Sequence, residues 1–231
     1  MLGTIANTLA IIAGSLLGLL FSRGIGDNYK EIILSGVGLS VVLIGVKSAL
    51  VSGDLMVVIF SVVIGSLLGE ALKIENQLQT MGIFLEKKVA AKSSDTKSFA
   101  RGFVTASLVF CVGSMAIVGS LESGLTGNHQ TLFAKSVLDG VTSVIFASTM
   151  GLGVMFSSIA VFLYQGLITV TAGFMKSFLV PETIAQMTSV GGLLIMAIGF
   201  NMLKITSIRV GNMLPAIFLP LAYFALRQLF L

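Results

Sequence analysis

One short polar stretch between two apolar runs carries most of the side chains that could do chemistry. Residues 120–140 contain Glu122, His129, Lys135 and Asp139, and His129 is the only histidine of the chain. A carboxylate and an ammonium can bind an ion or a polar solute inside a membrane. A metal site would need further histidine or carboxylate ligands clustered by spacing, and the sequence has none. We therefore predict no metal site, and we interpret His129 as a solvated loop residue.

The helix that must carry this stretch presents its polar groups on one face. Lys135 and Asp139 are four residues apart, and Thr142 and Ser143 continue the same polar face. Asp139 lies more than two turns into the helix, where an unpaired charge in a membrane costs roughly 2 to 3 kcal/mol. The face is therefore predicted to point inward, with Glu122 at its mouth. Two interpretations stay open: an ion pair that only joins helices, and a path for a solute or an ion.

The composition is that of an integral membrane protein. Of 231 residues, 55% are hydrophobic and 10% charged, whereas soluble domains carry roughly 25% charged residues. We predict one domain, residues 1–231, folded as an all-α membrane bundle of eight helices, or of seven if the fifth apolar run dips in and returns. The apolar runs are 3–22, 32–51, 55–72, 102–121, 134–156, 158–178, 184–203 and 210–230.

The second and seventh runs resemble each other. "SGVGLSVVLIGVKSAL" aligns with "SVGGLLIMAIGFNML", which matches Gly38 with Gly192 and Gly45 with Gly199. We predict an inverted repeat, as in many secondary transporters. The first run also resembles the fifth, so the repeat boundaries stay open. The predicted parts are a three-helix repeat over 1–73, a connection over 74–101, a central helix pair over 102–156 and a second three-helix repeat over 157–231.

The connection between the third and fourth runs is basic and amphipathic. The positive-inside rule places it in the cytoplasm, and the N-terminus outside. Counting charges does not separate seven spans from eight. The basic residues are Lys73, Lys87, Lys88, Lys92, Lys97 and Arg101. The apolar positions that predict a surface helix are Ile74, Leu78, Met81, Leu85 and Val89.

Small residues and two asparagines mark helix contacts. Gly14 with Gly18, and Gly65 with Gly69, have the Gly-x-x-x-Gly spacing that lets helix backbones approach closely. Asn7 and Asn212 lie near the starts of apolar helices, where an amide facing lipid would be unfavourable. We predict that both face the interior, as interhelical hydrogen bonds or as ligands of a solute or an ion.

Four stretches resemble a known family: "GSMAIVGSLESGLTGNHQTLFAKSVLDGVTSVIFASTMGLG", "GTIANTLAIIAGSLLG", "SVGGLLIMAIGFNMLKI" and "VGNMLPAI". The chain is similar over its length to the bacterial inner-membrane family of domain of unknown function 554, the YqgA/YdfK-like proteins. The resemblance implies a multi-pass plasma-membrane protein with a transport role and no established substrate. Glu122 and His129 lie in the variable part of the family pattern. That pattern covers Gly3, Asn7, Gly14, Gly18, Gly127, Lys135, Ser136, Leu138, Asp139 and the range Asn212 to Pro215.

These observations favour a transporter or channel for an ion or a small polar solute, with a path lined by Asp139, Lys135, Asn7 and Asn212. A non-catalytic scaffold packed through small residues is the alternative. One cysteine, one histidine and scattered acids make an enzyme a poor fit. We predict no cofactor. Because no phosphate-binding glycine loop precedes a lysine and a serine, we also predict that ATP is not the driving force in this chain. The predicted partners are the lipid bilayer and the solute, with a homo-oligomer left open and no nucleic acid.

Overall fold

A computed structural model describes residues 1–22, 27–52, 54–77, 80, 96–112, 114–175 and 179–230, and within these ranges every regular element is a helix. The prediction of an all-α bundle is therefore confirmed. The elements are α1 (Leu2–Ser22), α2 (Asp27–Ala49), α3 (Leu55–Leu72), α5 (Thr96–Cys111), α6 (Ser114–Leu125), α7 (Gln130–Met150), α8 (Gly153–Val170), α9 (Ala172–Met175), α10 (Pro181–Met202), the 3₁₀ helix η1 (Val210–Phe218) and α11 (Leu219–Phe230).

Seven described segments are long and apolar enough to cross a membrane, and a bent pair raises the number to eight. The seven are α1, the 31–49 part of α2, α3, α7, α8, α10 and η1 with α11. The bent pair is α5 with α6, which meet at 61°. Most of the predicted amphipathic helix over 74–89 lies outside the described residues, although 74–77 form a helical turn.

Three of the predicted apolar runs do not form one continuous α-helix. Gly151, with a φ of 77°, ends α7 and separates it from α8, so the fifth run is shorter than expected. Pro215 lies inside η1, where it lacks the N–H that an α-helix would use. The fourth run breaks between Cys111 and Ser114.

The bent pair follows α8 in the same direction over most of its length. A Cβ atom built on Gly102 would lie 2.9 Å from the carbonyl oxygen of Met150, and one built on Gly124 would lie 2.6 Å from Cβ of Ala172. The same two glycines also face Val154 and Thr169, positions that are separated by about 22 Å of helix. The pair is therefore best counted as one broken span rather than as a loop that returns.

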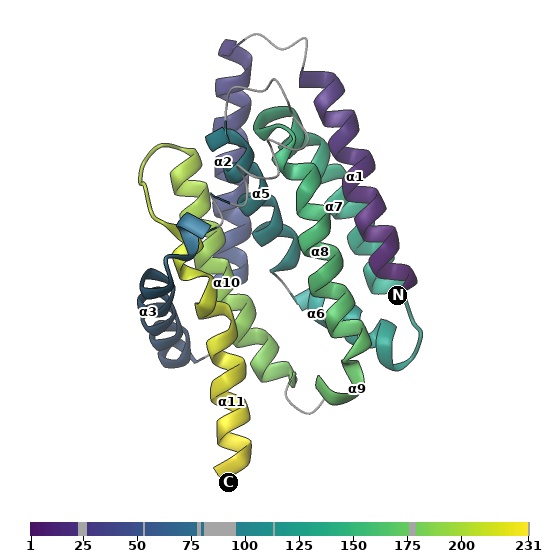
Figure 1. Cartoon of the computed structure of the whole chain (residues 1–231), viewed down its shortest axis with the longest axis vertical. Helices are drawn as coiled ribbons and strands as arrows, with labels where there is room; N and C mark the ends of the chain where they lie inside the picture. Colours follow the sequence, from purple (N-terminus) through teal and green to yellow (C-terminus); the bar gives the residue numbers. More distant parts are fainter. Residues whose placement is uncertain are drawn as a thin grey trace.

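The contacts between α1 and α7 agree with this count. Gly3 faces Leu132, Gly14 faces Gly140 and Gly18 faces Val144, so the two helices are parallel. In the chain, α2, α3 and the bent pair lie between α1 and α7. Because α2 and α3 each cross the bundle, α7 runs in the same direction as α1 only if the bent pair crosses it as well. Figure 1 shows α1 beside α7, both rising from the end of the molecule toward which α11 descends.

Two further helix pairs are antiparallel and close. α2 packs along α10, where a Cβ built on Gly192 would lie 2.8 Å from the carbonyl oxygen of Gly45. α3 packs along η1, where Gly69 meets the backbone of Asn212 and Gly65 meets Ala216. Glycine allows both approaches because a side chain would collide with the neighbouring backbone.

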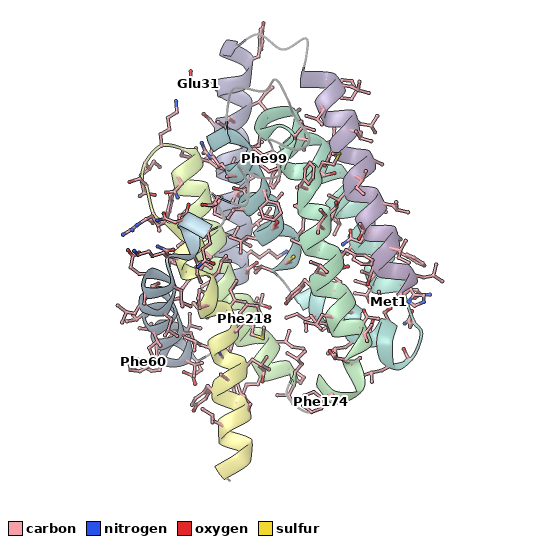
Figure 2. The ribbon with its side chains drawn as sticks, viewed as in Figure 1. Met1, Glu31, Phe60, Phe99, Phe174 and Phe218 are labelled. Atoms are coloured by element: carbon pink, nitrogen blue, oxygen red, sulfur yellow. The ribbon has the colours of Figure 1, made fainter. Side chains whose placement is uncertain are left out.

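Apolar side chains also cover the outside of the bundle. Phe60 on α3 is 60% exposed and Phe174 on α9 is 76% exposed, and Figure 2 shows both at the outer surface. Of the α10 segment, 78% is buried, against 22% for α3. α10 is thus a central helix, and the exposed apolar surface of the outer helices is suited to lipid.

Candidate functional site

Lys135 and Asp139 form a buried ion pair one turn apart on α7. The Lys135 ammonium nitrogen Nζ lies 2.9 Å from Oδ1 and 2.8 Å from Oδ2 of Asp139. Each residue is only 6% exposed. Asp139 is nine residues past the start of α7, about 13 Å along the helix. The pair therefore lies well inside the bundle, away from both ends of the helix.

Asn7 of α1 completes the set of groups around this carboxylate. Its Nδ2 donates a hydrogen bond of 3.0 Å to Oδ2 of Asp139. The contacts of Gly3 with Leu132 and of Gly14 with Gly140 hold α1 against α7 on either side of it. The amide oxygen Oδ1 of Asn7 is buried and has no hydrogen-bond partner in the described part of the chain. In this network Asn7 therefore uses its amide nitrogen but not its amide oxygen.

The break in the bent pair lies beside this network. Phe110, one residue before the end of α5, stacks on Phe146 of α7 with the ring centroids 6.0 Å apart, and Gly119 of α6 faces Leu132 of α7. The break between α5 and α6 therefore lies beside the part of α7 that carries Lys135 and Asp139. Non-helical backbone at membrane depth is tolerated only where it is buried in protein or lines a water-filled cavity. In many transporters such broken helices form the substrate or ion site. The break and the ion pair thus belong to one region of the molecule.

Thr142 and Ser143 bond to their own helix. The Thr142 hydroxyl donates to the carbonyl of Leu138 at 2.8 Å, and the Ser143 hydroxyl donates to that of Gly140 at 2.7 Å. Ser143 is buried against Gly14, whereas Thr142 is half-buried. In this structure the hydrogen bonds to the Asp139 carboxylate come from Lys135 and Asn7, and neither hydroxyl adds one.

Glu122 and His129 lie at the turn between α6 and α7. Oε2 of Glu122 accepts a hydrogen bond of 2.7 Å from the hydroxyl of Thr131. Nδ1 of His129 is 3.0 Å from the hydroxyl oxygen of Ser123. Among the described residues, no three His, Cys, Asp or Glu side chains are grouped to hold a metal ion. Glu122 therefore joins α6 to the first turn of α7, and His129 joins the turn to Ser123 of α6; these hydrogen bonds do not reach the ion pair.

Asn212 belongs to a second polar cluster. Its Nδ2 donates to Glu70 at 2.6 Å, and its Oδ1 accepts from the backbone N–H of Glu75 at 2.7 Å. Glu70 also pairs with Arg209 at 2.8 Å, and Glu75 accepts from the backbone of Gly211. The structure therefore brings Asn212 to the end of α3, whereas Asn7 lies on the α1–α7 contact.

We expect the Arg209–Glu70 pair to contribute little to stability. Their side chains are 66% and 52% exposed, and exposed pairs contribute up to about 1 kcal/mol. Arg209→Gln should therefore lower the free energy of unfolding by less than that amount. Asn212→Leu should cost more, because it leaves the Glu75 N–H and the Glu70 carboxylate without this partner. Thermal unfolding of both purified variants tests the order, and equal losses would contradict it.

Buried polar atoms without hydrogen-bond partners, which belong to ten residues of the described part of the chain, were not predicted from the sequence. Thr4, Ser120 and Gln165 are fully buried, and their side-chain polar atoms lack hydrogen-bond partners among the described residues. An unsatisfied buried polar group costs about 1 to 3 kcal/mol. Gln165 had a visible signal, a lone glutamine within the apolar run 158–178. The others with unpartnered buried atoms are Asn7, Ser15, Ser107, Thr169, Thr183, Gln186 and Thr188.

The comparisons with known proteins agree with this membrane architecture. The family model described as "Protein of unknown function (DUF554)" matches residues 2–225. The chain is 35% identical over 224 residues to the uncharacterized membrane protein YdfK of Bacillus subtilis, covering 95% of this chain and 94% of YdfK. It is 29% identical over 220 residues to the uncharacterized protein YqgA of Escherichia coli, covering 94% of each. No solved structure matches.

The match extends over nearly all the helices, including those that carry Asn7, Lys135 and Asp139. The YdfK name describes a membrane protein, and the long apolar helices of the bundle agree with that description. The protein is therefore a multi-pass membrane protein, and it belongs to the DUF554 family.

Proposed function

We propose that the protein is a transporter or channel for an ion or a small polar solute, and that the path passes Asn7, Lys135 and Asp139. The observation that carries the proposal is the buried Lys135–Asp139 pair, bonded across to Asn7 on α1. Ionisable residues inside membrane helices are rare and usually mark ion or substrate paths. Desolvating two charges is costly enough that apolar residues often stabilise a protein as well or better.

A self-neutralising pair could also serve only to join helices. Two observations favour a path over that role. The amide oxygen of Asn7 has no hydrogen-bond partner among the described residues, and the helix break lies beside the same part of α7. A group whose only role is to join helices has no need of an unsatisfied neighbour, because unpaired buried polar atoms destabilise the fold.

An inverted repeat would add support from the overall architecture. The sequence alignment matches Gly38 with Gly192 and Gly45 with Gly199. In the structure Gly199 faces the Gly38 carbonyl oxygen, and Gly192 faces that of Gly45. If each glycine is replaced by the one it matches in the alignment, the contact of Gly199 with Gly38 becomes the contact of Gly45 with Gly192. Two antiparallel helices related by a two-fold axis are expected to have such paired contacts. This relation supports an inverted pair of repeats, the arrangement of many secondary transporters.

We propose that the protein is not an enzyme. The function that competes with transport is that of a scaffold subunit. Close glycine packing between α1 and α7 fits a scaffold as well as a transporter. The deciding experiment is flux through purified protein in proteoliposomes, across a panel of cations, anions, amino acids and uncharged solutes. We expect at least one solute to move faster than in protein-free vesicles. A panel with no flux would favour the scaffold.

We further propose that the protein lies in the bacterial plasma membrane with the 70–101 connection in the cytoplasm. In a Cys111→Ser background, a cysteine at Ser94 should react in intact cells only with a membrane-permeant reagent. Because eight crossings return the chain to its starting side, a reporter fused after Leu231 should be external. Labelling of Ser94→Cys by an impermeant reagent would show that the 70–101 connection is outside the cell and would contradict the proposed orientation. An internal C-terminal reporter would contradict the eight-span count.

A further inference from the structure

Thr4, Ser120 and Gln165, whose side chains have no hydrogen-bond partner among the described residues, come from three different helices, α1, α6 and α8. We call these three residues the neutral layer. Gln165 is the most demanding of them, because both its amide nitrogen and its amide oxygen lack partners within the described residues. All three are fully buried. Together they present hydrogen-bond donors and acceptors without any charge.

Contacts with Leu132 place Thr4 and Ser120 at the same depth. A Cβ built on Gly3 would lie 2.6 Å from Cβ of Leu132, and one built on Gly119 would lie 3.0 Å from its Cδ2. Gly3 and Gly119 therefore flank the same leucine of α7. The residues that follow them, Thr4 and Ser120, therefore lie at the same depth, where α1, α6 and α7 meet.

Contacts of α8 place Gln165 at that depth as well. Gly124 of α6 faces Thr169 of α8 and Ala172 of α9. One turn earlier on each helix, the same faces carry Ser120 and Gln165. The methyl carbon of Met1 lies 3.5 Å from a Cβ built on Gly166, so the start of α1 is also level with Gln165.

The neutral layer adjoins the ion pair through α1. Asn7 is one turn beyond Thr4, and its unpartnered Oδ1 adds an acceptor to the set. Lys135 and Asp139 cancel each other's charge. A lone ion entering here would bring an uncompensated charge into a buried site, which is strongly unfavourable. A solute without net charge brings no such penalty, and its donors and acceptors can satisfy the free groups.

We propose that the neutral layer and Asn7 form a binding subsite for a small polar solute without net charge. This inference rests on the proposed transport function and narrows its substrate class. Two kinds of solute share the required chemistry. An uncharged solute would use the neutral layer, and a zwitterion would also exchange partners with the ion pair, its ammonium on Asp139 and its carboxylate on Lys135.

Osmotic re-swelling of proteoliposomes, followed by light scattering, tests the substrate class. The probes are urea and glycerol as uncharged solutes, glycine as the zwitterion, and a potassium and a chloride salt, each with an ionophore for the counter-ion. We expect accelerated re-swelling with at least one net-neutral probe and none with the salts. Urea or glycerol flux assigns an uncharged solute, and flux of glycine alone assigns a zwitterion. Flux of salts alone overturns the inference but leaves transport standing, and a complete lack of flux refutes transport itself.

Two glutamine variants test the location of the subsite. Gln165→Met removes the amide at similar size and should slow the flux at least tenfold without lowering thermal stability. The control is Gln186→Met, another buried glutamine, on α10, whose main neighbour is α2; it should retain wild-type flux. Ser120→Ala, expected to slow flux about threefold, is the second variant if Gln165→Met fails to fold. Unchanged flux in Gln165→Met, or an equal loss in Gln186→Met, overturns the subsite.

Discussion

Lys135→Met should destabilise the protein by about 3 kcal/mol or more, because it leaves the Asp139 carboxylate buried with only the Asn7 amide as a partner. Asp139→Asn should have a similar effect by leaving the Lys135 ammonium unpaired. The double variant Lys135→Met with Asp139→Asn should recover most of the loss, because no buried charge remains. Thermal unfolding of the purified proteins in one detergent measures all three.

The control for this cycle is the exposed pair of Lys204 with Glu31, whose side chains are 73% and 70% exposed. Lys204→Met should change stability by less than about 1 kcal/mol. If Lys135→Met were as mild as Lys204→Met, the ion pair would be hydrated rather than buried. If the double variant were no more stable than the single variants, the two charges would not depend on each other.

Gly14→Leu and Gly69→Leu should each prevent normal folding, with a loss of about 3 kcal/mol or more. A Cβ at Gly14 would collide with the carbonyl oxygen of Gly140, and one at Gly69 with that of Asn212. These neighbours are backbone atoms of the facing helix, so the helices must separate to admit a side chain. Yield of monodisperse protein and its unfolding temperature measure the effect.

Gly36 of α2 supplies a matched control, because it is exposed and a Cβ there would meet no atom of the described residues within 4 Å. Gly36→Leu should express and unfold like the wild type, or slightly better, since leucine favours a helix more than glycine does. Normal folding of both Gly14→Leu and Gly69→Leu would show that α1 and α3 do not pack as closely as described.

The helices could be predicted because their apolar runs match the membrane thickness, and the relation of Lys135 to Asp139 follows from a spacing of four on one helix. The partner of Asp139 on α1 could not be predicted in this way. Asn7 is 132 residues away in sequence, and only the packing of α1 against α7 brings it there. Asn7 and Asn212 both lie near the start of an apolar helix, which predicts one path for the two amides, but this local position says nothing about which carboxylate each amide meets.

The break between α5 and α6 could not be predicted from the sequence, for a different reason. The run 102–121 contains no charged residue, and hydropathy measures length and composition but not bending. The neutral layer was also hidden, because threonine and serine are common in membrane helices and usually bond to their own helix. Only Gln165 stands out in an apolar run, and its lack of partners depends on what α1 and α6 place around it.

The most direct test of a path past Asp139 is flux through the double variant Lys135→Met with Asp139→Asn, in proteoliposomes with wild-type protein at equal density. The comparison is decisive because the variant should fold and insert normally once both charges are removed. We predict that the wild type moves at least one solute of the panel and that the double variant moves it no faster than protein-free vesicles. Wild-type flux in a well-folded double variant would contradict the proposal that the path depends on this ion pair.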